Sequence, residues 1–381
     1  MPRELITIQV GQCGNQIGRQ FWKMALDEHA HHAKNATFDE SMSTFFRNVD
    51  KRGHELPLHK SITSLRARAI LVDMEEGPVS ETLKGPLGEL FDSSQFLTDV
   101  SGSGNNWDSL QSFFVMHSMG GGTGSGLGTY ILGLLEDHYP EAFRFTTGQL
   151  HLMTMWTDDS MLALRELTLH ADCVLPIENE ALYDMLEVNS DGFASVAYCV
   201  SCLQKQASQP GAAATRKKES AFDQMNSIVA RTLTHLTSSM RFDGDHQLIK
   251  TNPKGGIMLA CGLLLRGNVQ VSDIQANIQR LRAELRMIPW NEDGFKVGLC
   301  SVPALGHPVS LLSRDTFERM HTRFLKLYKR KAHVHHYLAY MDMSAFEDAV
   351  ENVQWLVAEY RKLNDTSSLD IPAASRPKPL F

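Results

Sequence analysis

The sequence has 381 residues, of which 43% are apolar and 21% are charged, a composition typical of globular proteins with two or three domains. The formal net charge of −7 argues against a general affinity for nucleic acid. No basic and apolar leader opens the sequence, and no apolar run reaches the roughly 18 residues that a membrane span needs. We therefore expect a cytoplasmic protein that binds neither nucleic acid nor membranes.

The first half of the chain predicts strands that alternate with helices. Apolar runs at residues 5–10, 69–72, 113–116 and 173–177 indicate strands. Helical spacing follows the first run, and a second helix is expected over residues 127–135, after a glycine-rich turn. Residues 31–64 have few periodic signals and are expected to form loops. A strand, a glycine turn and a helix, repeated, predict a doubly wound, mostly parallel α/β sheet.

The second half predicts a linker, a long helix, a smaller α/β unit and two terminal helices. Residues 205–220 are rich in Gln, Ser, Ala and Lys, as in an exposed linker. Apolar residues recur at helical spacing from Phe222 to Leu236, and strands are expected near residues 257–265 and 296–302. Two amphipathic patterns, at residues 317–327 and 346–360, predict helices, and the Ser/Pro-rich tail is expected to be disordered.

The six cysteines predict reduced thiols rather than a disulfide framework, because they are scattered, mostly among apolar neighbours. Cys199 and Cys202 form a C-x-x-C pair, but a metal or redox site needs a second ligand pair or a suitable context, and the sequence offers neither. The cysteines are Cys13, Cys173, Cys199, Cys202, Cys261 and Cys300.

The sharpest motif is G-G-G-T-G-S-G at residues 120–126, which we call the glycine loop. Glycines allow successive backbone N–H groups to point into one concavity and remove the Cβ atoms that would prevent close approach. The following helix contributes its N-terminal dipole and free N–H groups, and Thr123 and Ser125 can donate hydroxyl hydrogen bonds. The loop therefore predicts a site for two or three phosphates.

Three alternatives to this interpretation fit less well. No Lys-Ser/Thr pair follows the loop, so it is not a P-loop, and no window fits G-x-G-x-x-G, the dinucleotide fingerprint of dehydrogenases. A flexible glycine linker is disfavoured because four apolar residues of strand type lie just before the loop.

Two motifs together resemble the tubulin superfamily. The glycine loop matches the signature of that superfamily, and G-Q-C-G-N-Q-I-G at residues 11–18 matches its first phosphate loop, directly after the first strand. Residues 45–50, 73–77 and 101–107 are more similar to the epsilon class than to the alpha or beta class. The resemblance covers most of residues 3–363, although not continuously. It implies a tubulin-like fold, GTP or GDP as the ligand, and Mg²⁺.

The resemblance also implies a domain organisation. We expect a nucleotide-binding α/β domain over residues 1–204, an exposed linker over 205–220 and a core helix over 221–240. A shortened intermediate α/β domain over 241–312, C-terminal helices over 313–365 and a disordered tail over 366–381 would follow.

Individual site residues follow from the resemblance. Asp73 and Glu75 match an acidic pair near the phosphates, and hydrated Mg²⁺ prefers one or two acidic oxygens beside phosphate oxygens. Phe222 would stack on the base, and Asn179 and Asn226 would read guanine, since an amide both donates and accepts hydrogen bonds. Taken alone, the acidic pair also fits a solvated strand end, and Phe222 also fits core packing. The phosphate-binding residues implied are Gly11, Gln12, Cys13, Gln16, Gly104, Asn105, Ser118, Gly121, Gly122, Thr123 and Gly124.

The sequence departs from the family pattern in three places. The helix that the family has after Trp107 is missing, and residues 146–159 lack the proline-containing pattern that contacts the sugar. Residues 241–244 run directly into 245–248, where the family has a long segment that reaches the neighbouring subunit's nucleotide and carries the hydrolytic carboxylate. We therefore identify no catalytic residue and expect no autonomous hydrolysis. A missing helix also predicts exposed apolar sheet surface.

Residues 328–337, Y-K-R-K-A-H-V-H-H-Y, resemble the segment that joins the two C-terminal helices of the family. Three histidines suggest a metal, but no acidic or cysteine partner completes a ligand set. We predict packing and interface roles for the histidines, and an exposed helix face or partner surface for the basic run.

The leading hypothesis is a GTP-binding structural protein of the microtubule cytoskeleton. The epsilon-class resemblance implies a role in centrioles, basal bodies and centrosome organisation, with other tubulins and centriolar proteins as partners. The alternatives are a GTPase that is active only in a polymer, a truncated scaffold that binds no nucleotide, and, more remotely, a dehydrogenase.

Overall fold

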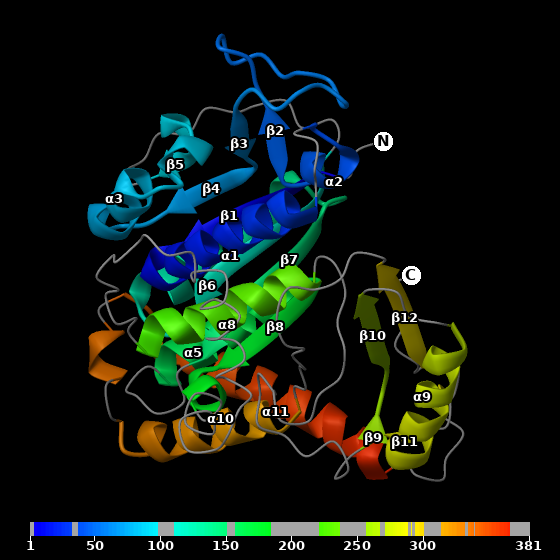
Figure 1. The fold of residues 1–381 in the computed structure, drawn as a ribbon. Coiled ribbons are helices and arrows are strands. Elements are labelled where there is room, and N and C mark those ends of the chain that lie inside the picture. The colour runs from blue at the N-terminus through cyan, green and yellow to red at the C-terminus, as the bar shows by residue number, and fades with distance from the viewer. Residues whose placement is uncertain are drawn as a thin grey trace.

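A six-stranded parallel sheet forms the centre of the computed structural model (Figure 1). Its strand order is β5-β4-β1-β6-β7-β8, and every neighbouring pair is parallel. The predicted doubly wound, mostly parallel α/β sheet is confirmed. The strands are β1 (Glu4–Val10), β4 (Ala69–Val72), β5 (Phe96–Leu97), β6 (Leu110–Ser118), β7 (Phe143–Leu150) and β8 (Cys173–Glu178). The structure describes residues 4–32, 37–97, 110–150, 157–183, 221–236, 257–266, 271–288, 291, 294–300, 314–331, 334–338 and 340–365.

Helices cover both faces of this sheet. On one face α1 (Gly11–His32) and α8 (Ala221–Leu236) lie side by side (Figure 1). Their apolar sides meet the sheet in a cluster that includes Phe21, Phe114 and Leu233. On the other face α4 (Gly128–His138) and α5 (Thr157–His170) pack on the sheet, and α10 (Arg314–Tyr328) and α11 (Met343–Asp365) pack on α5. The helices predicted from residues 222–236, 317–327 and 346–360 are therefore present.

The expected exposure of apolar sheet surface is not seen at β1, but it is seen on β12 (Phe295–Cys300), where Val297 is 40% exposed and Leu299 is 58% exposed. Ile6, Ile8 and Val10 point toward the cluster formed with α4 and α5, and none of them is more than 3% exposed. Other large apolar side chains are also exposed, among them Met74, which is 72% exposed, and Tyr130, which is 63% exposed.

Some of the shorter elements lie next to the main sheet, and others form a second group. Next to the sheet lie α2 (Glu40–Ser43), the antiparallel pair β2 (Phe46–Asn48) and β3 (Leu65–Ala67), α3 (Glu76–Lys84), and the 3-10 turns η1 (Gly88–Leu90) and η2 (Ser93–Gln95). The second group has two parallel pairs, β10 (Cys261–Arg266) with β12 (Phe295–Cys300) and β9 (Ile257–Met258) with β11 (Arg286–Met287), and α9 (Val271–Glu284). None of the helices in the described ranges is long and apolar enough to cross a membrane.

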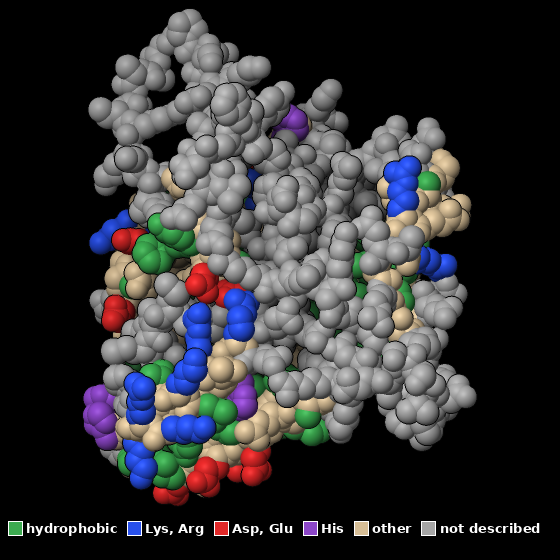
Figure 2. All heavy atoms as spheres, turned by 90° about the horizontal axis from the view of Figure 1, so that it is seen from below, with side chains coloured by type: hydrophobic (Ala, Val, Ile, Leu, Met, Phe, Trp, Pro, Cys, Tyr) green, Lys and Arg blue, Asp and Glu red, His purple; other side chains and the backbone are tan. Residues whose placement is uncertain are grey.

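The face that contains α10 and α11 carries charges of both signs. Figure 2 shows Lys and Arg side chains gathered in a row on this side, with Asp and Glu side chains beside them. Lys326 of α10 and residues 329–331 after it are exposed, and so are Glu347 and Glu351 of α11. The basic run at 329–331 thus lies on the surface, as its composition predicts.

Candidate functional site

Two loops meet where the strand order of the sheet reverses. β1 continues into α1 at Gly11, and β6 continues through the glycine loop into a π-helical turn, η3 (Thr123–Leu127), and then α4. Because β1 and β6 are parallel neighbours, their carboxyl ends open at the same edge. In open α/β sheets, ligands bind in the crevice at this kind of switch point.

Gly11 brings the two loops into contact. Its φ of 72° lies in the left-handed region, and a Cβ added there would be 3.4 Å from the Gly124 nitrogen and 3.5 Å from Thr123 Cβ. Asn15, one turn into α1, donates from Nδ2 to the carbonyls of Gly11, at 3.0 Å, and Val72, at 3.3 Å. The ends of β1 and β4 are thereby tied to the start of α1.

Gly122 and Gly124 have different surroundings within the glycine loop. A Cβ on Gly124 would lie 2.6 Å from Ser118 Oγ and 2.8 Å from the Ser118 carbonyl oxygen, so a side chain there would collide with the end of β6. Ser118 Oγ donates to the Gly120 carbonyl at 2.5 Å. Gly122 is exposed, and a Cβ there would meet no atom within 4 Å. A substitution at Gly124 therefore disturbs the loop itself, whereas one at Gly122 changes only what approaches the loop.

The buried side chain of His117 forms a hydrogen bond with the glycine loop. The ring is fully buried, and its Nδ1 lies 2.9 Å from the Gly124 carbonyl while Nε2 lies 2.9 Å from Thr146 Oγ1. Burial lowers the pKa of His117, which keeps the ring neutral. Since Nδ1 faces a carbonyl, it carries the proton and donates, and the Thr146 hydroxyl donates to Nε2.

Asp159, in the first turn of α5, holds the glycine loop from the side. Its Oδ2 accepts the Gly121 N–H at 3.1 Å, and its Oδ1 accepts the Tyr337 hydroxyl at 2.5 Å. Burial and the neighbouring Asp159 raise the pKa of Tyr337, so this hydroxyl stays protonated and donates. Tyr337 follows the 3-10 turn η6 (Val334–His336), so the segment between α10 and α11 is joined to the loop.

Amide side chains gather on the other side of the first phosphate loop. Asn226 Nδ2 donates to Gln16 Oε1 at 3.2 Å, and Phe222, one turn earlier on α8, is 61% exposed. At the ends of β7 and β8, Gln149 Nε2 donates to Asn179 Oδ1 at 2.5 Å. Amides beside an exposed aromatic ring suit a planar heterocycle whose edge has donors and acceptors.

Asp73, directly after β4, is a carboxylate with one unsatisfied oxygen. The residue is 4% exposed, its Oδ1 accepts the Glu75 N–H at 3.2 Å, and burial raises the pKa of its carboxyl. Its Oδ2 is buried and has no hydrogen-bond partner among the described residues. A hydrated Mg²⁺ would satisfy such an oxygen, so Asp73 fits a metal beside phosphates. The Glu75 side chain is exposed.

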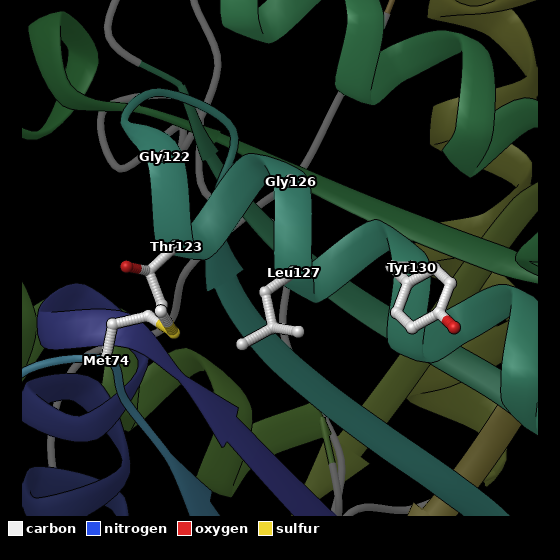
Figure 3. A pocket seen from close by; sticks show the side chains of 6 residues that line it. All are labelled: Met74, Gly122, Thr123, Gly126, Leu127 and Tyr130. Atoms are coloured by element: carbon white, nitrogen blue, oxygen red, sulfur yellow. The ribbon is translucent and has the colours of Figure 1, made fainter. Parts of the chain in front are cut away.

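A shallow hollow of about 540 Å³ lies on the outer side of the glycine loop. In Figure 3, Met74 and Thr123 approach each other there, with Leu127 and Tyr130 along the same side of η3 and α4. Thr123 and the Tyr130 hydroxyl contribute the polar side-chain groups of this lining, beside the backbone of Gly122 and Gly126.

Most of the predicted site residues are brought together, and several further residues hold them. Gln12 is exposed at the start of α1, and Cys13 contacts Gln149. Gly104 and Asn105 lie outside the described residues. Sequence reasoning missed Asn15, His117, Gln149 and Asp159. The one local pattern that could have indicated them is their position, because each is a polar residue near the end of a strand or in the first turns of a helix.

Comparisons with known proteins decide the family. The model of the Tubulin/FtsZ family GTPase domain matches residues 4–110 and 107–187, and that of the tubulin C-terminal domain matches residues 220–322. The chain belongs to the tubulin family.

Similar proteins in that family cover nearly the whole chain. The tubulin epsilon chains of Mus musculus and Homo sapiens are 41% and 40% identical, over 97% of this chain and 98% of each relative. The tubulin beta-2 chain of Suillus bovinus is 27% identical, over 96% of this chain and 97% of the relative. These matches identify a tubulin-like, GTP-binding protein of the cytoskeletal kind.

Internal segments are missing relative to these proteins. The alignment with the mouse chain runs over 473 positions, 92 more than the 381 residues present here. The GTPase-domain match also divides at residues 107–110, where the sequence predicts that a helix is absent.

Proposed function

We propose that this chain is a structural protein of the microtubule cytoskeleton that holds GTP or GDP between its two phosphate loops. The observation that carries the proposal is the contact of Gly11 with Gly124 at the switch point of the sheet. Glycines at this contact let the two loops approach each other beside the starts of α1 and α4, and helix starts are favourable places for phosphates. The similarity to tubulin epsilon chains supports a location at centrioles, basal bodies and the centrosome, with other tubulins and centriolar proteins as partners.

Each group of residues has one role in this proposal. Phe222 stacks on the base, Asn179 and Asn226 bind its edge, and Asp73 contacts Mg²⁺ through water. Mg²⁺ would neutralise phosphate charge beside the loops. The phosphates are bound by the two loops, with Gly11, Gln12, Cys13, Gln16, Ser118, Gly121, Gly122, Thr123 and Gly124, and by Gly104 and Asn105.

Binding without autonomous hydrolysis is the form of this proposal that the sequence favours. Hydrolysis needs a positioned water and a base, and the family segment that carries the carboxylate has no counterpart after Gly244. The second candidate is a GTPase active in a polymer, which the match to a GTPase domain favours. Phosphate release by the isolated chain, measured with saturating GTP and Mg²⁺, would decide for an autonomous enzyme.

The direct test is GTP binding by the purified chain, compared between two variants of Gly122. Gly122→Asp places a carboxylate in the open space before the phosphate site, and Gly122→Asn places an uncharged group of the same shape there. Both residues are favourable at a helix start, so the fold should be retained. We expect GTP affinity to fall about tenfold or more in the Asp variant and less than about threefold in the Asn variant.

Two outcomes contradict the proposal. One is folded wild-type protein that binds no guanine nucleotide in equilibrium dialysis. The other is equal affinity in the Asp and Asn variants, which would place the phosphates away from the glycine loop.

A further inference from the structure

Gln149 joins the first phosphate loop to the base-reading position. It lies near the end of β7 and is 3% exposed. Its Oε1 accepts the thiol of Cys13, and its Nε2 donates to Asn179 Oδ1 at 2.5 Å. Three elements, α1, β7 and β8, are thus connected through a single buried carboxamide.

The order of donors and acceptors along this connection is fixed by Cys13. Burial raises the pKa of the Cys13 thiol to about 12, so the sulfur carries a proton and donates it. The Gln149 oxygen is the stronger acceptor for this thiol and faces it, and the Gln149 nitrogen faces Asn179. Asn179 accordingly presents its oxygen to Gln149.

We propose that Gln149 is a specificity-determining residue that selects guanine over adenine by fixing the direction of the Asn179 carboxamide. The inference rests on the proposed function, because it assigns a partner to the residue that reads the base. Gln149 itself touches no nucleotide in this scheme, and it acts through Asn179 as a positioning residue.

The chemistry of purines gives a fixed amide its discriminating power. Guanine has an acceptor at position 6 and a donor at the neighbouring ring nitrogen, whereas adenine has the donor and acceptor exchanged. A carboxamide that rotates freely can suit either base, since its two ends have nearly the same shape. An amide held in one direction suits one base and leaves an unpaired polar group against the other.

The test is the ratio of ATP to GTP dissociation constants in Gln149→Met, which keeps the length of the side chain and removes its polar atoms. The matched control is Thr147→Val, on the same face of β7, where a buried hydroxyl lacks a partner in the described structure. We expect the ratio to fall about tenfold in the Met variant and to change less than about twofold in the control.

A double-mutant cycle with Asn179→Ala separates positioning from general support of the site. If Gln149 acts through Asn179, adding Gln149→Met to the Ala variant leaves the ratio unchanged. A purely structural role would weaken GTP and ATP binding by the same factor in both backgrounds. An unchanged ratio in the Met variant, or a further fall in the Ala background, overturns the inference.

The same measurements keep this inference apart from the proposed function. Wild-type protein that binds no GTP would remove the proposed function itself, whereas GTP binding with an unaltered ratio in the variant removes only the role of Gln149. Should Gln149→Met not fold, Gln149→Asn serves the same purpose, because its amide is too short to bridge Cys13 and Asn179.

Discussion

His117 is a neutral ring in a buried place, and its surroundings make the glycine loop sensitive to acid. The ring donates to the Gly124 carbonyl and accepts from Thr146, so a second proton on Nε2 would force the Thr146 hydroxyl to rotate and accept, and would place a positive charge in a buried site. Because burial lowers the pKa of His117, the folded state takes up this proton at lower pH than the unfolded state does.

The sign of the resulting pH dependence follows directly. Between about pH 6.5, where an unfolded histidine titrates, and the lower pKa of the folded ring, the unfolded state binds the extra proton. The free energy of unfolding should therefore fall with falling pH in that window, by up to about 1.4 kcal/mol per pH unit.

His117→Gln removes this proton and isolates its contribution, because carboxylates elsewhere titrate alike in both proteins. Urea denaturation at pH 7.5, 6.5 and 5.5 measures the difference. We expect the gap in stability between wild type and variant to shrink as the pH falls. A gap that stays constant over this range would mean that the folded ring takes up the proton as easily as the unfolded one.

Local sequence signals located some site residues and missed others for one physical reason. Gly11 and the glycine loop could be predicted because several glycines directly after an apolar run are a local pattern. His117 and Gln149 each have a partner that is distant in sequence: Thr146 lies 29 residues after His117, and Asn179 lies 30 residues after Gln149. Only the folded sheet brings those atoms together.

At the scale of elements, two arginines one turn apart on α10 form ion pairs with glutamates at the end of β8. Arg319 Nη2 lies 2.7 Å from Glu178 Oε2, and the Glu178 side chain is fully buried. Arg323 Nη2 lies 3.9 Å from Glu180 Oε2, in a pair whose side chains are 37% and 24% exposed. The two glutamates flank Asn179, so α10 supports the strand end that the base would contact.

The two arginines should differ in their contribution to stability. Arg319→Met leaves the buried Glu178 carboxylate without its charged partner, and since Arg319 is itself partly exposed we expect a loss of about 2 kcal/mol in the free energy of unfolding. Arg323→Met, the matched control, should cost less than about 0.5 kcal/mol. Chemical denaturation measures the free energy of unfolding of both variants. An equal loss in the two would show that the pair with the buried glutamate contributes no more to stability than the other pair does.

Elements were predictable where their apolar residues repeat regularly. α8 and α10 follow helical spacing, and β6 contains four consecutive apolar residues. No such pattern predicts β7, because several of its buried residues are polar, namely Arg144, Thr146, Thr147 and Gln149. Arg144 is satisfied there by Asp172 and the His170 carbonyl, partners that lie beyond the strand.

At the scale of the whole molecule, helices cover both faces of the six-stranded sheet, although the chain lacks segments that other members of the family have. Large buried side chains fill both faces, with Trp22 and Phe114 on the side of α1 and Leu132 and Phe324 on the side of α4 and α5. Both phosphate loops start from strands inside this covered sheet. A chain that lacks segments reaching toward a neighbouring subunit can therefore retain its own nucleotide site.

This argument predicts that guanine nucleotide stabilises the isolated chain. A ligand that binds only the native state raises the free energy of unfolding by RT ln(1 + [L]/Kd), about 2.7 kcal/mol at a hundredfold excess over Kd. We expect the midpoint of thermal unfolding to rise steadily with the logarithm of GTP concentration in the presence of Mg²⁺. Differential scanning fluorimetry measures this rise.

The Gly122→Asp variant provides the control for that measurement. Its fold should resemble that of the wild type, while its carboxylate repels the phosphates, so its midpoint should rise much less at the same GTP concentration. A scaffold that binds no nucleotide would give the same midpoint at every GTP concentration in both proteins. A rise of equal size in the two proteins would instead indicate that GTP binds outside the glycine loop, because only that loop differs between them.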